Sequence, residues 1–354
     1  MASGKPREMP PLNDVGERLQ KILDAFVAKD VVGASLAVGR PGEAMLRLAS
    51  GFAERENRVP MSSNHLFRVA SCTKMFTAAL LLRLVQNGRL ELDEPIVRWF
   101  PDLPKGDRIF VRQLLNHRSG LPDYEQDFPE LSDKKWKPRE LVDLALRAGT
   151  QAEPGGDFAY TNTGLILAGM IVEAEGGERL SQRIREQLFE PFGLTESWCG
   201  TDETPPEERR ARANFHTGIG ILDSTNWFDP SGMGAAGDIV STPGDLVLWL
   251  EALFGGKVLD DARFEEMAAN LCPAALAGTP LIEAGHGLLV FKYDEIVVKG
   301  HLGQIRGFVT MAAHDESNGI NVSLATNSGA RDVLSPHMTT IHDALGKVLH
   351  ALRA

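Results

Sequence analysis

The feature that most limits how this chain can fold is the position of its strand patterns, which lie near both ends and are scarce in between. Two β-like runs, GASLAVG (33–39) and EAMLRLASG (43–51), flank the turn sequence Arg40-Pro41-Gly42 and predict a hairpin. The other strand patterns come late, as HGLLVF, EIVVKG, GFVTMAA and INVSLATN. Few strands are predicted between about residues 85 and 220, so one sheet has to be assembled from both ends of the chain.

Helical patterns account for much of the remaining sequence. Apolar residues fall on one face over residues 14–29 and on one stripe over residues 334–352. In the middle, Pro138–Ala148 and Thr161–Glu175 are predicted helices, and Gly176-Gly177 closes the second one. These patterns predict an α+β fold, with an antiparallel sheet flanked by helices and an inserted all-helical domain.

The insertion makes the sheet domain discontinuous in sequence. We expect this domain to comprise residues 1–84 and 222–354, and the helical domain to comprise residues 85–221. The sequence has no internal repeat and no low-complexity tract, so neither domain is expected to be a repeat array.

Composition argues against several classes of function. The chain has 354 residues, of which 43% are hydrophobic, which is enough for a sizeable core. Its formal net charge is −11 and it has no basic run, so we expect no nucleic-acid partner, because phosphates need a counter-charge. The polar, proline-rich N-terminus and the lack of a long apolar stretch predict a cytoplasmic protein with no membrane partner.

Cysteines and histidines give no support for a metal or another cofactor. Cys72, Cys199 and Cys272 are odd in number and far apart, which favours reduced thiols. The nine histidines form no HExxH motif and no close pair with a cysteine, so no metal site is predicted. A small molecule is the expected partner, and nothing in the sequence indicates an oligomeric state.

Ser71 and Lys74, in the stretch FRVASCTKMFTAALLL, are the first candidates for catalysis. They lie three positions apart at the start of a predicted helix, where their side chains can touch. A serine becomes a good nucleophile when a neighbour takes its proton, and a lysine can do so when desolvation lowers its pKa. The apolar run after Lys74 favours such burial. A helix-capping serine beside a solvent-exposed lysine would leave the same pattern, so this motif needs support from elsewhere.

Two later stretches supply that support. YTNTGLILAGMI places Tyr160 and Asn162 directly before an apolar helix, and VKGHLGQIRGF places His301, Gly303 and Gln304 at the edge of a strand. Each has an ordinary structural interpretation by itself: a loop aromatic, a helix cap and a buried strand histidine. As a set they supply the second base and the oxyanion site that a serine nucleophile requires.

The motifs SxxK, YxN and HxG, in this order, resemble those of the serine β-lactamase and penicillin-binding-protein-like hydrolases. The resemblance is strongest to the group of class C β-lactamases, D-alanyl-D-alanine carboxypeptidases and D-aminopeptidases. It extends through LFRVASCTK, VRQLLNHRSGLPDY, PFGLTES and AAGDIVSTPGDL. It implies the β-lactamase/transpeptidase-like fold, with the active site in the cleft between the sheet and the helical domain.

The resemblance also implies a role for each motif residue. Ser71 would be the acylated nucleophile, Lys74 and Tyr160 would share the work of the base, and Tyr160 would protonate the leaving group. Asn162 would hold Lys74 and the substrate amide. The backbone N–H groups of Ser71 and Gln304 would form the oxyanion hole. For Tyr160 to act as a base, we expect the charge of Lys74 to lower its pKa.

Within this group the chain looks most similar to D-amino-acid amidases. Penicillin-recognising enzymes often have Lys-Thr-Gly at the late motif, whereas here His301-Leu302-Gly303 carries at most a part-time charge. In the amidases an acidic residue after GLPD binds the α-ammonium of the substrate. Glu125 has the matching place, with Gln304 as a second contact, and would repel a peptide or lactam carboxylate. The implied reaction releases ammonia from D-amino-acid amides through an acyl-enzyme.

Other interpretations stay open. The same fold serves D-aminopeptidases, DD-carboxypeptidases, β-lactamases and carboxylesterases, and a non-catalytic penicillin-binding-like protein is a further alternative. Arg306 would be placed to bind a substrate carboxylate, and Asp123 is an alternative to Glu125 for binding the α-ammonium. Cys72 is expected to be a small buried filler and not a rival nucleophile. The segment between Trp198 and Trp227 looks shorter than in the amidases, which leaves the size of the substrate open.

Overall fold

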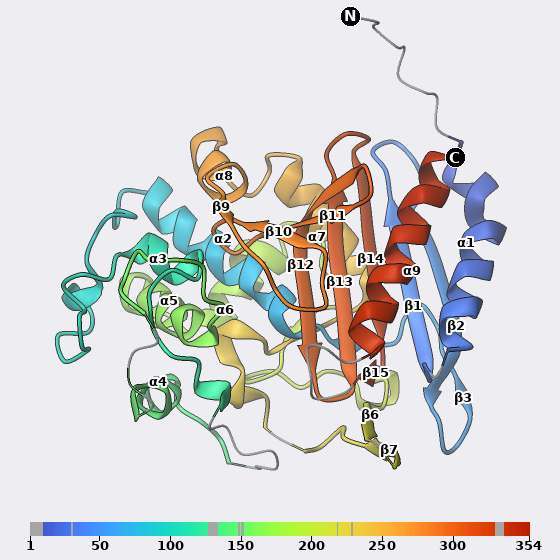
Figure 1. Ribbon diagram of the computed structural model, residues 1–354, viewed down its shortest axis with the longest axis horizontal. Coiled ribbons are helices and arrows are strands. Elements are labelled where there is room, and N and C mark those ends of the chain that lie inside the picture. The colour runs from blue at the N-terminus through green and yellow to red at the C-terminus, as the bar shows by residue number, and fades with distance from the viewer. Residues whose placement is uncertain are drawn as a thin grey trace, which may run out of the picture.

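The computed structural model is built around a nine-stranded antiparallel sheet (Figure 1). Its strands come from both the N-terminal and the C-terminal part of the chain. The structure describes residues 10–29, 31–126, 134–147, 149, 152–217, 219–227, 229–329 and 336–354. The strand order is β3-β2-β1-β14-β13-β12-β11-β10-β9. Helices lie on both sides of this sheet, so the fold is the α+β, β-lactamase/transpeptidase-like architecture expected from the sequence.

The strands of this sheet match the predicted strand patterns closely. Its members are β1 (Gly33–Gly39), β2 (Leu46–Glu54), β3 (Val59–Pro60), β9 (Cys272–Pro273), β10 (Leu281–Ala284), β11 (Leu289–Tyr293), β12 (Ile296–Ile305), β13 (Phe308–Asp315) and β14 (Ile320–Thr326). The predicted hairpin is β1–β2, and β1 also pairs with β14, where Leu36 lies opposite Leu324. The two ends of the chain therefore meet at the centre of one sheet.

The α-helices of the described residues have the following bounds: α1 (Leu12–Val27), α2 (Thr73–Gln86), α3 (Val111–Leu115), α4 (Pro138–Arg147), α5 (Asn162–Gly176), α6 (Leu180–Ile184), α7 (Pro243–Phe254), α8 (Asp261–Ala268) and α9 (Pro336–Arg353). Gly177 ends α5 in the left-handed conformation, as the double glycine predicts. In the described part of the chain, no helix combines the length and the apolar character needed to cross a membrane.

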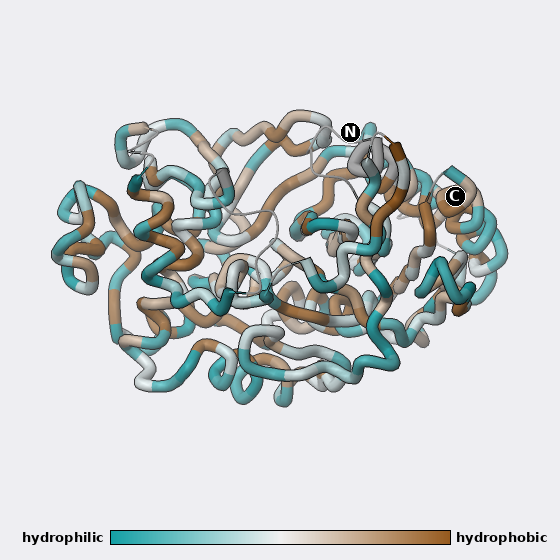
Figure 2. The backbone as a smooth tube through the Cα atoms, turned by 90° about the horizontal axis from the view of Figure 1, so that it is seen from below, coloured by the Kyte–Doolittle hydropathy of each residue, from teal (hydrophilic) through white to brown (hydrophobic). Residues whose placement is uncertain are grey.

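Helices α1 and α9 lie side by side on one face of the sheet (Figure 1). The apolar stripe of α1, including Leu19 and Leu23, is buried together with Leu345 of α9 and with Val38 and Val322 of the sheet. Figure 2 shows hydrophobic stretches mostly inside the molecule and hydrophilic stretches along many of its outer turns. Burial of these two amphipathic stripes is what holds the ends of the chain together.

The opposite face of the sheet meets the helices from the middle of the chain. Leu80 of α2, Leu165 of α5 and Leu250 of α7 share one buried cluster with Phe308 and Ala312 of β13. Every residue of α2 from Thr73 to Leu82 is buried, so this helix is enclosed on all sides. A helix that is apolar all round belongs in the interior of a domain, which explains why α2 has no exposed polar face over this stretch.

The middle of the chain is mostly helical but also holds short strands. β5 (Trp198–Cys199) pairs with β8 (Ile239–Ser241), which also pairs with β4 (Phe67–Arg68). A third sheet consists of β6 (Asn214–Thr217), β7 (Gly220–Asp223) and β15 (Ser328–Gly329). The segment 85–221 is therefore not purely helical, and its division from the sheet remains a prediction.

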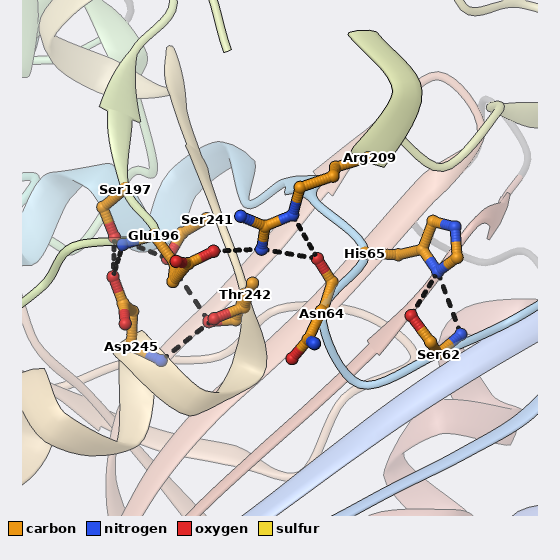
Figure 3. A network of polar contacts seen from close by, with 9 residues as sticks. All are labelled: Ser62, Asn64, His65, Glu196, Ser197, Arg209, Ser241, Thr242 and Asp245. Atoms are coloured by element: carbon orange, nitrogen blue, oxygen red, sulfur yellow. Dashed lines mark hydrogen bonds and ion pairs between the residues drawn. The ribbon is translucent and has the colours of Figure 1, made fainter. Parts of the chain in front are cut away.

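A network of polar side chains joins the loops around β8 and β5 (Figure 3). The Asp245 carboxylate accepts hydrogen bonds from the Ser197 hydroxyl and the Glu196 backbone N–H, both at 2.8 Å. Arg209 forms an ion pair with Glu196 and donates to the backbone oxygen of Asn64 at 2.7 Å. These contacts fasten the start of α7 to segments that are far away in sequence.

Candidate active site

Ser71 lies in a single turn of 3-10 helix, Ala70–Cys72, that connects β4 to α2. Ala70 has a positive φ of 48°, an uncommon conformation for a residue with a side chain, and such strain is typical of functional sites. Cys72 is the N-cap of α2 and makes no side-chain cap hydrogen bond. Helix capping therefore does not account for Ser71, whose side chain is partly exposed to solvent.

Lys74 is fully buried, and its amine touches the serine. Nζ lies 2.8 Å from Ser71 Oγ, 2.6 Å from Asn162 Oδ1 and 2.8 Å from the backbone oxygen of Ala236. Desolvation lowers the pKa of Lys74 to about 8, although the carboxylates of Glu125 and Asp123 act in the opposite direction. The alternative of a lysine that reaches solvent is therefore wrong.

The three contacts fit a neutral amine as well as an ammonium. A neutral lysine has two N–H donors and one lone pair. The Asn162 and Ala236 oxygens are pure acceptors and take the two donors. In the ammonium form Nζ donates to Ser71 Oγ, and in the neutral form the lone pair would take that place and accept the hydroxyl proton. The geometry suits proton transfer from Ser71 to Lys74.

Tyr160 and Asn162 precede and begin α5, with Thr161 between them as the N-cap. Asn162 is thus not the helix cap, and its side chain is free to contact Lys74. A side-chain hydrogen bond links Tyr160 to Ser71, and the amine of Lys74 lies 5.2 Å from the tyrosine ring centroid. The polar ends of the three predicted catalytic side chains do come together.

The expected lowering of the tyrosine pKa does not occur. Desolvation raises the pKa of Tyr160, and the charges of Glu125 and Asp123 raise it further, whereas the hydrogen bond with Ser71 lowers it. Tyr160 is therefore protonated at neutral pH. The lowered pKa of Lys74 favours the lysine as the base, and the sharing of this role with Tyr160 stays a prediction.

The late motif lies on β12, directly beside the serine turn. β11 pairs with β12 only as far as Gly300, which leaves the edge beyond it open to the turn Ala70–Cys72. A Cβ atom at Gly303 would lie 2.0 Å from the Val69 oxygen and 3.1 Å from the Ser71 nitrogen. Only glycine permits this approach, which brings the backbone before Gln304 against the N–H of Ser71.

His301 is fully buried, and its Nδ1 lies 2.6 Å from the Leu302 oxygen. Desolvation, followed by the charge of Lys74, lowers the pKa of His301 well below its ordinary value. The partial protonation that we expected for His301 near neutral pH is therefore absent. Its ring centroid lies 6.5 Å from that of Tyr160, so His301 is a neutral wall of the site.

Two carboxylates lie on the other side of Asn162. Its Nδ2 donates to Asp123 at 3.2 Å, and a side-chain hydrogen bond also links it to Glu125. Desolvation and then the charge of Asp123 raise the pKa of Glu125 to about 7, while Lys74 and Arg306 lower it. Glu125 reaches solvent and Asp123 does so in part. The site therefore combines a serine, a buried amine and two carboxylates whose pKa values are raised by desolvation.

Cys72 is buried, as predicted, and its Sγ points toward the His301 backbone oxygen at 3.5 Å. Desolvation raises the pKa of this thiol to about 12, so it is not a rival nucleophile. None of the three cysteines is in a disulfide. Within the described ranges, no group of three or more His, Cys, Asp or Glu side chains is arranged to hold a metal ion.

Sequence reasoning missed two contributors to the site. The backbone oxygen of Ala236, which accepts from Lys74, comes from the stretch AAGDIVSTPGDL, but a backbone acceptor leaves no signal in the sequence. His117 stacks on Tyr160 with ring centroids 4.3 Å apart. It lies in VRQLLNHRSGLPDY, which pointed to the family but not to a contact with Tyr160.

Comparison with known proteins shows the family of this chain. A family model described as Beta-lactamase matches residues 19–344. The solved structure of D-amino acid amidase from Ochrobactrum anthropi SV3, complexed with L-phenylalanine, is 48% identical with a TM-score of 0.93, covering 96% of this chain and 98% of that one. A D-stereospecific amidohydrolase from Streptomyces sp. is 28% identical with a TM-score of 0.80, covering 92% and 97%.

A curated relative points to the same family. Penicillin-binding protein 4* of Bacillus subtilis (strain 168) is 27% identical over 310 residues, which are 83% of this chain and 68% of that protein. The chain therefore belongs to the β-lactamase family. Within it, the chain is a serine hydrolase that is similar in sequence and fold to the D-amino acid amidase of Ochrobactrum anthropi SV3.

Proposed function

We propose that this protein hydrolyses D-amino-acid amides to D-amino acids and ammonia, through an ester formed on Ser71. The observation that carries the proposal is the contact of 2.8 Å between Ser71 Oγ and the amine of Lys74, with two acids beside it. The contact between Ser71 and Lys74 supplies a nucleophile and its base. The two acids supply a place for a positively charged substrate group.

In the first step, neutral Lys74 takes the hydroxyl proton of Ser71 while Oγ forms a bond to the amide carbon. The carbonyl oxygen becomes negatively charged and accepts hydrogen bonds from the N–H groups of Ser71 and Gln304. Oxyanion donors of this kind typically contribute a factor of about 10²–10³ in rate. The approach of Gly303 to the Ser71 nitrogen supports this assignment.

In the second step, Tyr160 donates its phenolic proton to the amide nitrogen, the C–N bond breaks and ammonia leaves. The ammonium of Lys74 then returns a proton to the phenolate, so that both groups regain their starting forms. Water attacks the ester by the reverse proton route and releases the acid. The raised pKa of Tyr160 and the lowered pKa of Lys74 support this division of roles.

Glu125 is our choice for the group that binds the α-ammonium, with Gln304 as its second contact. A carboxylate that reaches solvent beside the nucleophile favours a cation there. Together with Asp123 it would repel a substrate with a carboxylate near the scissile bond, such as a lactam or the end of a peptide. The similarity to the Ochrobactrum anthropi amidase supports the same class of substrate.

The test is ammonia release from D-phenylalaninamide and L-phenylalaninamide, measured beside hydrolysis of nitrocefin and of a neutral p-nitrophenyl ester. We expect the D-amide to be the best amide substrate and Ser71→Ala to abolish turnover. Intact-mass analysis of the wild type with a fluorophosphonate should show one adduct, which Ser71→Ala lacks. Faster turnover of nitrocefin than of any amide would contradict the proposal.

Substrate recognition is tested separately with Glu125→Gln, which keeps the size of the side chain but removes its charge. We expect kcat/KM for the D-amide to fall at least about 100-fold, since a charge-assisted contact contributes roughly 1.5–3 kcal/mol and a buried partner more. The neutral ester should change less than threefold. Equal losses on both substrates would remove Glu125 from ammonium binding, and Asp123→Asn would then be the next variant to compare.

A further inference from the structure

His117 touches three consecutive residues of the segment that carries Tyr160. Its backbone oxygen accepts a hydrogen bond from the Ala159 N–H at 2.9 Å. Its ring lies parallel to that of Tyr160, with centroids 4.3 Å apart and an interplanar angle of 25°. Its Nδ1 lies 3.3 Å from the Thr161 nitrogen and 3.2 Å from the Thr161 oxygen. One residue thus holds the chain before, at and after the phenol.

The conformation of His117 is unusual for a residue that only fills space. It has a left-handed backbone with φ of 58°, and its side chain is 1% exposed. Its Nε2 is buried and has no hydrogen-bond partner within the described residues. Desolvation, followed by the charge of Lys74, lowers the pKa of His117 to about 3, so the ring is neutral. Strain and an unpaired buried nitrogen both cost stability, which points to a purpose at this site.

We propose that His117 is a positioning residue, whose stacked ring fixes the phenol of Tyr160 at the leaving-group nitrogen of the amide. This inference rests on the proposed role of Tyr160 as proton donor. The tyrosine side chain is partly exposed to solvent, and its hydrogen bond to Ser71 fixes only the phenolic end. A parallel ring at stacking distance removes that freedom, and a displacement of about 1 Å in such a group costs roughly 10²-fold in rate.

This role predicts a dependence on the leaving group. An amide must have its nitrogen protonated before the C–N bond breaks, whereas p-nitrophenolate leaves without a proton. A defect in the position of Tyr160 should therefore slow acylation by amides, measured as kcat/KM, much more than acylation by activated esters. A defect in folding, in Ser71 or in Lys74 should slow both substrates equally.

The experiment compares three variants with the wild type on D-phenylalaninamide and on the p-nitrophenyl ester. His117→Asn suits the left-handed backbone but lacks the ring, and His117→Phe keeps a ring but lacks Nδ1. Tyr160→Phe removes the phenolic proton itself. His342→Phe is the matched control, since His342 is another buried, neutral histidine and contacts Tyr293 on the far side of the sheet.

We expect His117→Asn to lower kcat for the amide about 100-fold with KM within twofold, and to change kcat/KM for the ester less than fivefold. His117→Phe should retain at least a fifth of the amide rate, and His342→Phe should match the wild type. Thermal unfolding of each variant shows whether it is folded. If His117→Asn is unstable, the test uses His117→Phe instead. The quantities measured are then the ratio of its amide rate to its ester rate and the change of this ratio with the pKa of the leaving group.

The outcomes separate this inference from the proposed function. If Tyr160→Phe lowers kcat/KM equally for amide and ester, the assignment of Tyr160 as proton donor to the leaving group is wrong. If Tyr160→Phe is selective for the amide but His117→Asn is not, His117 does not position the phenol and the present inference fails. If His117→Phe loses as much amide activity as His117→Asn, the contact with Thr161 is the important one and the stacked ring is not.

Discussion

Lys74 shows how a single residue can be set by its surroundings for one task. Its amine has lost its hydration shell and gained three oxygen neighbours, of which only Ser71 can give up a proton. Desolvation wins over the attraction of two nearby carboxylates, and the pKa falls to about 8. A lysine on the surface would stay charged up to about pH 10 and would be useless as a base at neutral pH.

The pH dependence of activity follows from these ionisations. The proposed mechanism needs neutral Lys74 and charged Glu125, so kcat/KM for D-phenylalaninamide should rise from pH 6 to a maximum near pH 8. It should fall again at higher pH, because the α-amino group of the substrate loses its proton near pH 8. For the neutral ester only Lys74 matters, and the profile should rise to a plateau. A steady-state pH series on both substrates checks this, and identical profiles would contradict it.

Gly303 is a second residue where one atom decides function. Gly303→Ala would place a methyl group 2.0 Å from the Val69 oxygen, so β12 or the serine turn would have to move. We expect kcat to fall at least about 100-fold, since the oxyanion donors would be displaced. Gly16→Ala is the control: the nearest atom to its new methyl is 3.8 Å away, and helix propensity predicts about 0.5–1 kcal/mol of added stability with full activity. Kinetics and urea unfolding of both variants test this pair.

At the scale of elements, the site depends on the joining of a loop, a helix start and a strand edge. α2 brings Lys74, the start of α5 brings Asn162, and β12 brings Gly303. Regular backbone pairing is interrupted at the site. The pairing of β11 with β12 stops at Gly300, and a 3-10 turn precedes α2. Because backbone polar groups at such ends lack regular partners, they are available to a substrate.

The start of α7 offers a test of stability at this scale. Burial raises the pKa of Asp245 to about 6, and hydrogen bonds from Ser197 and Glu196 only partly offset this. Its folded pKa is above the unfolded one, so its stabilisation is complete at low pH and is lost as the pH rises through about 6. Asp245→Asn keeps an oxygen for both donors. We expect it to raise the free energy of unfolding at pH 8 by about 1–3 kcal/mol.

Urea unfolding at pH 5 and pH 8 measures this effect. The difference in the free energy of unfolding between the two pH values should be smaller in Asp245→Asn than in the wild type. Ser197→Ala serves as the comparison, because it removes one donor and should destabilise the protein at both pH values. A variant that is less stable than the wild type at pH 8 would show that Asp245 is stabilising as a carboxylate.

On the scale of the whole molecule, the two predicted domains share one core. Leu80 of α2 and Leu165 of α5 belong to the same buried cluster as Phe308 of the sheet, and Phe67 packs edge-on against Phe308 with centroids 6.3 Å apart. The helix α2 belongs to the sheet segment in the predicted division, yet it packs against α5. Residues of both predicted domains therefore pack into one buried cluster.

We expect this shared core to unfold as one unit. Differential scanning calorimetry should give a single transition whose van't Hoff and calorimetric enthalpies agree, if unfolding is reversible. Residues 85–221 produced alone should lack a cooperative transition in circular dichroism, because the apolar side chains of α2 are missing from that fragment. Two resolved transitions in the full chain would support the independent domains that the sequence pattern suggests.

Much of the fold, and the grouping of Ser71, Lys74 and Asn162, could be predicted from sequence, because both depend on local signals. Alternation and helical spacing are properties of neighbouring residues, so β1 and the end of α5 at Gly177 were predicted nearly to the residue. The spacing of Ser71 and Lys74 likewise requires only that both lie in one helical turn. The order of the three motifs then indicated the family.

The protonation states of the site residues, and the contacts of neighbouring residues with them, were decided by the tertiary structure. The sequence led us to expect a lowered pKa for Tyr160 and a part-time charge on His301, and burial reverses both. The stacking of His117 on Tyr160 joins segments 43 residues apart, and no local pattern specifies it. Desolvation depends on every atom packed around a group, and those atoms come from all parts of the chain. A sequence therefore names the reactive groups, and only packing sets which of them hold their protons.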